Sequence, residues 1–405
     1  MLRLFNSLNK KIETFRPANK RVVTVFTCGP SVYQRAHIGN FRTFLFEDVL
    51  VRYLKYSGYS AVRGMNLTDI EDKAIIEAVK KKMTLKNLSE KNIREFVAEM
   101  RLLRMRIPDY LPKASGSVDE AVEIIGQLLE RKIAYRHNGN VYFDPLKFPG
   151  FGKLYGLDMS KWPEEKRRFH KDTYPGTRWN LGDFILWHGY KKGDKHYWDT
   201  GIGRGRPAWN IQDPGMIAKF INEPLSIYCG GVDNLFRHHD YTMAVLESVR
   251  PYPMAKFWLH CENLCVNGRK MSKSKGNILY TDTLLGQGYD ISEIRFFLIY
   301  GHYRQQINYS DKMMRATAGK LRALKRLVRL IRKKSGQNHE GKNPVIRQLK
   351  KTFVGNMDND VNAGKAFDGL YKMVSNINID DLKPGEAAGI TAALKEIDRV
   401  FQIIF

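Results

Sequence analysis

The sequence predicts an α/β protein in which a doubly wound parallel sheet is split by an insertion and followed by a helical bundle. Three observations carry this prediction. A strand, a helix and a second strand follow one another within residues 21–65, strand character returns at 225–228, and helical patterns dominate after about residue 290. At 405 residues, the chain is long enough for two or three domains with a sizeable core.

The first strand–helix–strand unit places a ligand site. Residues 21–26 are rich in β-branched side chains, a helix is expected from about Gly39 to Ser57, and residues 60–65 read as the second strand. Ligands of doubly wound sheets bind at the carboxyl ends of the strands. We therefore expect the binding site to lie at residues 27–40 and 66–72.

The middle of the chain reads differently. A helical pattern at 118–132 is followed by a short strand at 140–144 and a basic, aromatic stretch rich in Gly and Pro. We interpret this part as an insertion between two halves of the sheet. The predicted division is 1–112 and 201–265 for the two halves of the sheet domain, 113–200 for the connective insertion, 266–310 for a region that contains a basic loop, and 311–405 for the helical bundle.

The composition excludes several classes of protein. With 43% hydrophobic and 27% charged residues, the chain is neither disordered nor embedded in a membrane, and no apolar run approaches the ~18 residues of a spanning helix. The N-terminus lacks the apolar core of an export signal, and four cysteines give no disulfide framework. The formal charge of +25 favours polyanionic partners. We expect a cytoplasmic protein.

Part of this charge lies on one predicted helix. Residues 311–334 carry ten Lys or Arg and one acid, and apolar side chains recur at Leu321, Leu324, Val328 and Ile331. An ordinary solvated helix face would have this pattern too. Because ten like charges repel one another without a partner, a helix that faces a polyanion is the favoured interpretation.

The first candidate site is the segment 36–40, A-H-I-G-N, between the first strand and its helix. His37 and Asn40 are polar donors beside a helix N-terminus, where free backbone N–H groups and the helix dipole favour a phosphate. Gly39 would let a ligand approach the backbone closely. Taken alone, His37 reads more readily as a helix-capping or core histidine.

The second candidate site is the segment 270–277, K-M-S-K-S-K-G-N. Its three lysines also suit a solvated surface turn. Together, the two segments resemble the H-I-G-H and K-M-S-K-S signatures of the class I aminoacyl-tRNA synthetases, whose catalytic domain is a Rossmann-type sheet. The second signature matches at all five positions, and the pairing outweighs the surface-turn interpretation.

Further segments are similar to the cysteinyl-tRNA synthetase family in particular. Asn40 is that family's variant of the last position of the first signature, and the similarity extends from about Leu4 to Ile404. The other segments that carry it are Thr27–Tyr33, Phe41–Thr43, Asn66–Ile70, Asp183-Phe184, Leu186-Trp187, Gly205–Pro207, Gly230–Asp233, His238-His239 and Gly301–Arg304.

The resemblance implies a reaction in which the carboxylate of an amino acid attacks the α-phosphate of ATP and pyrophosphate leaves. Charge gathers on phosphate oxygens, so fixed donors and cations contribute most of the catalysis. Mg²⁺ is expected with the nucleotide. By resemblance, the phosphates are stabilised by His37 and Asn40, the leaving pyrophosphate is neutralised by Lys270 and Lys273, and the nucleotide is bound at Gly39, Gly230, Gly231 and Asp233, with Asp233 on the ribose.

The resemblance also implies an amino-acid pocket at Cys28, Gly29, Thr68, Trp209 and Asp213. Members of the family hold zinc there with two Cys, one His and one Glu, because this borderline-soft metal binds a thiolate. Cys28 and His238 occupy two ligand positions, whereas Asp213 and Thr242 replace a cysteine and the glutamate. Asp213 is an acceptable third zinc ligand. We nevertheless expect a missing or weakened metal and an altered specificity, with cysteine as the default substrate.

The tRNA acceptor arm is the expected macromolecular partner, beside the basic helix at 311–334. Family members continue past the bundle with a small anticodon-reading domain, whereas this chain stops at Phe405, so we expect no anticodon recognition. Two alternatives stay open: a related ligase that passes the aminoacyl group to a small amine or a modified tRNA base, and a catalytically silent RNA-binding module. A monomer is the default expectation.

Overall fold

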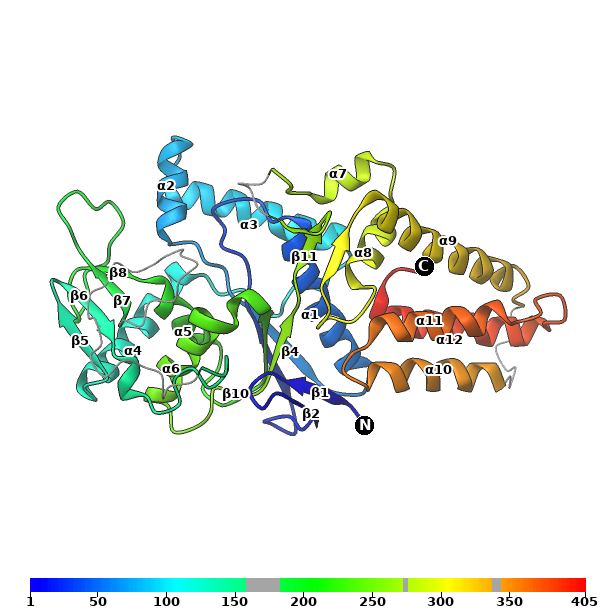
Figure 1. Cartoon of the computed structure of the whole chain (residues 1–405), viewed down its shortest axis with the longest axis horizontal. Coiled ribbons are helices and arrows are strands. Elements are labelled where there is room, and N and C mark those ends of the chain that lie inside the picture. Colours follow the sequence, from blue (N-terminus) through cyan, green and yellow to red (C-terminus); the bar gives the residue numbers. More distant parts are fainter. Residues whose placement is uncertain (158–182, 272–275, 337–343) are drawn as a thin grey trace.

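The computed structural model describes residues 1–157, 183–271, 276–336 and 344–405. Its parts lie along one axis (Figure 1): an antiparallel sheet lies at one end, a parallel sheet in the middle and a bundle of helices at the other end. None of the described helices combines the length and the apolar character that spanning a bilayer requires.

The central sheet is parallel throughout, with the strand order β10-β9-β3-β4. Two strand–helix–strand halves meet where β3 pairs with β9, which confirms the predicted doubly wound fold. The strand order reverses at this point, so the crevice at the carboxyl ends of β3 and β9 is the expected ligand position. The elements of the two halves are β3 (Val23–Thr27), α1 (Ile38–Tyr56), β4 (Ala61–Met65), β9 (Leu225–Gly231), α6 (Asp240–Val249) and β10 (Ala255–Cys261).

Burial explains why the sequence pattern located these elements. All five residues of β3 are buried, and a continuous apolar, β-branched run suits a strand that is covered on both faces. Helix α1 is buried at 13 of its 19 positions. The observed bounds of β3, α1 and β4 agree with the predicted ones within two residues.

A second, antiparallel sheet has the order β5-β6-β7-β8. The predicted insertion at 113–200 contributes three of its strands, and the fourth follows residue 200. Part of the insertion, residues 158–182, lies outside the described residues. The elements of this region are α4 (Val118–Glu130), β5 (Ala134–His137), β6 (Asn140–Phe143), β7 (Phe184–Gly189), β8 (Gly205–Pro207) and α5 (Trp209–Phe220), after α2 (Asp72–Lys80) and α3 (Leu85–Leu102) in the first half.

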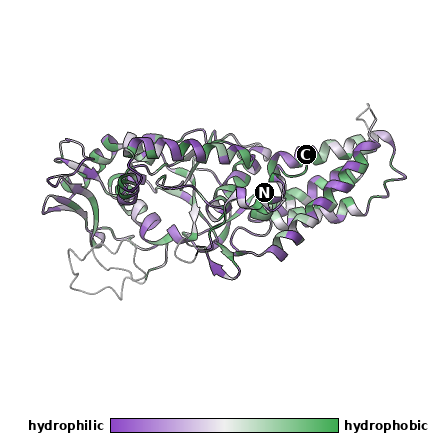
Figure 2. Cartoon of the chain, turned by 90° about the horizontal axis from the view of Figure 1, so that it is seen from above, coloured by the Kyte–Doolittle hydropathy of each residue, from purple (hydrophilic) through white to green (hydrophobic). Residues whose placement is uncertain are grey.

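Helices α9, α10 and α11 each bury one face, whereas α8 is buried along almost its whole length. Figure 2 shows hydrophilic and hydrophobic residues alternating along the ribbons of the bundle. The four residues of the predicted apolar stripe of the basic helix, Leu321, Leu324, Val328 and Ile331, are all buried. This burial confirms the 3.6-residue period. The helices are α7 (Thr281–Gly286), α8 (Ile291–Ile299), α9 (Asp311–Lys333), α10 (Pro344–Met357), α11 (Ala363–Ser375) and α12 (Pro384–Phe401).

A fully buried ion pair joins helix α1 to helix α8. The Asp48 carboxylate on α1 accepts hydrogen bonds from Arg295 of α8 at 2.6 Å, from Arg52 at 2.9 Å and from the backbone N–H of Arg106 at 2.8 Å. Arg295 also donates to the carbonyl of Phe401 at 2.6 Å. Burial alone would raise the pKa of Asp48, but the two guanidinium groups outweigh it and hold the pKa below its usual value.

The N-terminal hairpin makes a second connection. Its strands are β1 (Arg3–Asn6) and β2 (Lys11–Thr14). The Asn6 side chain bonds the backbone of β10, with Nδ2 2.9 Å from the Lys256 carbonyl and Oδ1 3.1 Å from the Trp258 amide. The N–H of Phe5 donates to the carboxylate of Asp360, in the loop before α11, at 2.8 Å.

Short elements complete the chain between the two main regions. A three-stranded sheet has the order β12-β11-β13. Its strands are β11 (Leu264–Val266), β12 (Arg269–Lys270) and β13 (Ile307–Tyr309), and short helical turns occur at Ala114–Gly116, Pro145–Lys147, Val232–Asn234 and Leu235–His239.

Candidate active site

A cavity of about 350 Å³ opens at the carboxyl ends of β3 and β9. Gly230 and Asp213 lie behind its lining, and Lys273 lies outside the described residues. The other predicted site residues all line the cavity: Cys28, Gly29, His37, Gly39, Asn40, Thr68, Trp209, Gly231, Asp233, His238 and Lys270. The fold thus brings the two motif segments together.

The first motif segment forms the N-terminus of α1. His37 is the N-cap residue: its Nδ1 atom accepts a hydrogen bond from the Asn40 N–H at 3.3 Å, and Asn40 Oδ1 accepts from the His37 N–H at 3.0 Å. Because Nδ1 accepts, the neutral ring carries its proton on Nε2, which is then the donor. His37 therefore caps the helix and also lines the cavity.

The second motif segment reaches the same cavity through β12. The Lys270 ammonium lies 2.5 Å from one carboxylate oxygen of Asp233, and Asn263 donates to the other oxygen at 2.8 Å. Both charged side chains are about half exposed. An exposed pair of this kind contributes little stability, so a bound nucleotide can replace it. Asp233 and Lys270 are thus held together at the cavity mouth.

A close backbone approach fixes the segment after β3. A Cβ atom on Gly29 would lie 2.0 Å from the carbonyl oxygen of Asn66, so only glycine fits there. The backbone N–H of Thr68 donates to the Pro30 carbonyl at 3.2 Å, and that of Val32 donates to the Thr68 carbonyl at 3.0 Å. These contacts hold Thr68 against the cavity wall.

The deeper end of the cavity is lined by Cys28 and His238. The Cys28 Sγ atom lies 3.5 Å from His238 Nε2 and accepts from the Asn234 side-chain amide at 3.5 Å. Trp209 stacks on the His238 ring with the centroids 4.1 Å apart. Burial, followed by the negative charge of Asp213, raises the pKa of the Cys28 thiol well above its usual value. The thiol is therefore neutral here.

Asp213 lies behind this wall and does not line the cavity. Its carboxylate is fully buried and accepts from Asn66 at 2.8 Å and from the Tyr228 hydroxyl at 3.1 Å. His238 Nε2 lies 3.0 Å from the same carboxylate. The predicted contact of Asp213 with the substrate is thus replaced by a hydrogen-bond network that orients His238, because both oxygens are already engaged.

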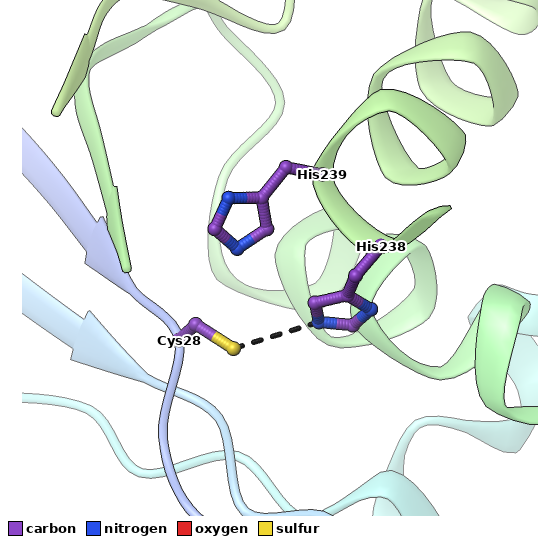
Figure 3. A group of neighbouring side chains, drawn as sticks. All are labelled: Cys28, His238 and His239. Atoms are coloured by element: carbon purple, nitrogen blue, oxygen red, sulfur yellow. Dashed lines mark hydrogen bonds between the residues drawn. The ribbon is translucent and has the colours of Figure 1, made fainter. Parts of the chain in front are cut away.

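His239 is a site residue that the sequence did not indicate. Its Nδ1 atom lies 2.8 Å from His260 Nε2, and His260 Nδ1 lies 2.8 Å from the Ser7 hydroxyl. In Figure 3, the imidazole of His239 points toward Cys28 and His238. Within the described part of the chain, its buried Nε2 atom has no hydrogen-bond partner. A Cβ atom on Gly230 would lie 2.5 Å from this ring, so only glycine leaves room for it.

The backbone before α6 departs from a regular helix, which the sequence did not predict. Adjacent residues of a regular helix point about 100° apart. Residues 235–239 form an irregular turn whose backbone is non-helical at Phe236 and Arg237, with φ of 67° at Arg237. After this turn, one ring nitrogen of His238 and one of His239 lie within 4.8 Å of each other and of Cys28 Sγ. The adjacent pair of histidines was the available signal.

Three side chains of the types that bind zinc meet at this end of the cavity, although the set differs from the two Cys, one His and one Glu of the family. Cysteine and histidine are the ligands that zinc prefers, and Cys28, His238 and His239 bring three such atoms within 4.8 Å of one another. The unpartnered, buried Nε2 of His239 is a further sign, because buried polar atoms ordinarily find a partner. The residues present therefore fit the metal.

Comparison with known proteins decides the family. The model of the family described as tRNA synthetases class I (C) catalytic domain matches residues 14–319. The chain belongs to this family. Among class I (C) synthetases, it is 36% identical over 416 residues to the cysteine–tRNA ligase of Chlamydia pneumoniae, covering 100% of this chain and 86% of the relative. The identity to the cysteine–tRNA ligase of Koribacter versatilis is 35% over 414 residues, covering 100% and 82%.

Solved structures show the same fold at much lower identity. Methionyl-tRNA synthetase of Mycobacterium tuberculosis, in complex with methionyl-adenylate, superposes with a TM-score of 0.64 at 14% identity, covering 95% of this class I chain and 90% of that one. The LeuRS-tRNA-LeuAMS ternary complex of Agrobacterium radiobacter gives a TM-score of 0.68 at 12% identity, covering 96% and 85%. The class I architecture is thus shared across the whole chain.

Proposed function

We propose that the chain is an ATP-dependent ligase that activates an amino acid, cysteine, as an aminoacyl-adenylate and transfers it to tRNA. The observation that carries this proposal is the single cavity that joins His37 and Asn40 to Asp233 and Lys270 at the switch point of the sheet. Class I membership and the cysteine–tRNA ligase relatives support the reaction and the amino acid.

The geometry supports a mechanism of positioning and charge stabilisation. His37 Nε2–H and the Asn40 amide are placed at the N-terminus of α1, where a dipole and free N–H groups favour phosphate oxygens. Lys270 neutralises the leaving pyrophosphate after it separates from Asp233, which then binds the ribose hydroxyls. Lys273 is proposed for the same task as Lys270, and Mg²⁺ for the nucleotide phosphates.

The amino acid occupies the deeper end of the cavity in this proposal. Thr68, Trp209 and Cys28 belong to the lining at that end. A zinc ion held beside Cys28 and His238 would supply a Lewis acid that selects a thiolate over a hydroxyl. The chain's own groups position the substrate: Trp209 closes one side of His238, and Asn66 with Asp213 fixes the other.

ATP–pyrophosphate exchange tests the activity and the amino acid together. The purified chain should exchange label in the presence of cysteine and remain near background with serine, alanine and valine. Charging of tRNA with cysteine should follow. Exchange with none of the twenty amino acids would contradict the ligase proposal, and exchange with serine but not cysteine would contradict the amino-acid assignment.

Neither alternative function gains support from the comparisons. A ligase for a small amine or a modified tRNA base finds no counterpart among the relatives described above, which are named cysteine–tRNA ligases. A silent RNA-binding module would have no need of the hydrogen bonds that hold Asp233 and Lys270 at the cavity mouth. Both alternatives predict the absence of cysteine-dependent charging at the 3′ end of tRNA.

Replacing His37 by Asn separates its structural role from its proposed catalytic role. Asn is among the best N-cap residues, so helix α1 should keep its cap and the melting temperature should stay unchanged. The Nε2–H donor is lost, and we expect ATP–pyrophosphate exchange to fall about 100-fold. His37→Ala should show the same fall together with about 1 kcal/mol of lost stability. If His37→Asn retained full ATP–pyrophosphate exchange, His37 would have only the structural role of capping helix α1.

The basic helix α9 is proposed to contact the tRNA acceptor arm. Lys320, Arg322 and Lys325 make ion pairs within the protein. By contrast, among the described residues, Arg326, Arg329 and Arg332 pair with no acidic group, and all three are exposed. Unpaired, exposed guanidinium groups that recur every third residue suit a row of phosphates.

Neutralising these three arginines should weaken tRNA binding. The triple variant Arg326→Ala, Arg329→Ala, Arg332→Ala is expected to bind tRNA about 10- to 100-fold less tightly and to lower the slope of log K against log salt by about 2 to 3. Filter binding over a salt series measures both. The matched control replaces Arg16, Lys20 and Arg21, which are exposed beside the amino end of β3. Equal losses in both variants would refute a specific contact.

The remaining proposals concern organisation. We propose domain boundaries after residues 112, 200, 265 and 310. We also propose that the protein is a monomer and lies in the cytoplasm. Size-exclusion chromatography coupled to light scattering decides the oligomeric state directly.

A further inference from the structure

Three buried side chains at the deep end of the cavity form a metal site of a kind that the sequence alone did not predict. The ligand atoms of Cys28, His238 and His239 lie within 4.8 Å of one another, and no other such group occurs among the described residues. We propose that these three side chains hold a zinc ion, with His239 as the ligand that compensates for the family positions now occupied by Asp213 and Thr242.

The distances fit tetrahedral coordination. With Zn–S near 2.3 Å and Zn–N near 2.0 to 2.1 Å, two ligands of a tetrahedral site lie about 3.5 Å apart. The Cys28 Sγ and His238 Nε2 atoms are separated by 3.5 Å. Three protein ligands leave one position open, as in zinc sites that bind a substrate. Cys28 and His238 line the cavity, so the open position faces it.

His239 is prepared for coordination by the groups behind it. Metal-bound histidines ordinarily donate their second ring N–H to a hydrogen-bond acceptor, which fixes the tautomer. Here Nδ1 of His239 can donate to His260, and His260 can donate to the Ser7 hydroxyl, each at 2.8 Å. This direction leaves a lone pair on His239 Nε2, the atom that is buried without a partner in the described structure.

The surrounding charges balance a divalent cation. Metal binding releases the Cys28 thiol proton to solvent, and the thiolate with the Asp213 carboxylate then offsets two positive charges in a buried place. Asn234 already donates to Cys28 Sγ. Asp213 keeps its donors Asn66 and Tyr228 when the metal replaces its contact with His238.

This assignment differs from the ligand set that the sequence suggested. Asp213 was the candidate third ligand, but its carboxylate is not part of the close group of donor atoms. We expected weakened metal binding because Asp213 and Thr242 replace two family ligands. In the structure, His239 lies close enough to Cys28 and His238 to act as a third ligand.

Cobalt and zinc titrations of the full chain test the proposal without ATP, amino acid or tRNA. After removal of metal with a chelator, one equivalent of Co²⁺ should give a thiolate-to-cobalt charge-transfer band and the intense visible bands of tetrahedral Co²⁺, and one equivalent of Zn²⁺ should abolish both. Failure to bind either metal at one per chain overturns the site. It would leave the ligase proposal intact, because exchange is measured separately.

Two matched variants identify the third ligand. His239→Asn should weaken zinc binding at least about 100-fold in a chelator competition, and Asp213→Asn should weaken it about tenfold or less. The reverse order would assign the site to Asp213 and overturn the role of His239. Melting temperatures of the metal-free variants report whether each one folds.

X-ray absorption of the zinc-loaded wild-type chain gives an answer even if His239→Asn does not fold. One sulfur and two imidazoles should be found in the first shell. A single imidazole would overturn the proposal.

Discussion

Replacing Lys270 by Ala is expected to slow cysteine-dependent ATP–pyrophosphate exchange by about 10²- to 10³-fold. The reason is the charge that develops on the leaving pyrophosphate, which a fixed ammonium group stabilises more in the transition state than in bound ATP. The loss should therefore appear in kcat, while KM for ATP changes less than about tenfold. Initial rates over a range of ATP concentrations separate the two constants.

Arg269 provides the matched control for this variant. It precedes Lys270 on β12, is exposed, and has no acidic partner within the described structure. Arg269→Ala should retain exchange within about threefold. Similar losses in both variants would mean that β12 needs positive charge in general, and retained activity in Lys270→Ala would remove Lys270 from the proposed mechanism.

Replacing Asp48 by Asn is expected to cost about 3 to 5 kcal/mol of stability, because Arg295 would remain fully buried without its direct ion-pair partner. The loss should be largest in helices α1 and α8, which this pair joins. Hydrogen exchange of their amides measures it without assuming two-state unfolding of the whole chain. Unchanged protection of both helices would contradict this account of the ion pair.

The Asp48 effect should depend on pH with a definite sign. The folded-state pKa lies below the ordinary value of about 3.9, so the charged carboxylate stabilises the fold above that pH. The stabilisation disappears as the pH falls through the folded-state pKa, and the difference between wild type and Asp48→Asn should shrink below about pH 4. Asp368→Asn removes an exposed partner of Lys320 and should cost only about 0 to 1 kcal/mol at any pH.

The fold was predictable where burial leaves a regular pattern. The buried run of β3 and the apolar stripe of α9 mark one strand and one helix without reference to any neighbour. The strand order was not predictable in this way. Pairing of β3 with β9 joins residues 202 positions apart, Val25 with Ile227, and no local pattern encodes such a contact.

The candidate site was predictable in part. From the sequence, His37 and Lys270 could be assigned to one site only because their two motifs resemble those of a known family. In the structure, both residues line the same cavity. Asp213 was assigned to the wall of the pocket because it replaces a cysteine. Its hydrogen bonds to Asn66 and Tyr228 depend on side chains from β9 and the segment after β4, which composition and spacing do not reveal.

The net charge of +25 does not show where the positive charges lie. Arg42, Arg63 and Arg295 are all buried, where they bond carbonyl oxygens or carboxylates. Glu47, the partner of Arg63, has its pKa raised by burial to about 7. A count of charged residues does not distinguish such internal groups from those that attract RNA.

The N-terminal hairpin has a consequence for the order in which the protein folds during synthesis. Asn6 forms a hydrogen bond with Lys256, and Phe5 forms one with Asp360. The partners of the first strand are therefore synthesised 250 and 355 residues later. Such distant contacts close late. Ser7, which supports His260 behind His239, belongs to this segment, so the proposed metal site would be complete only after the hairpin has docked on β10.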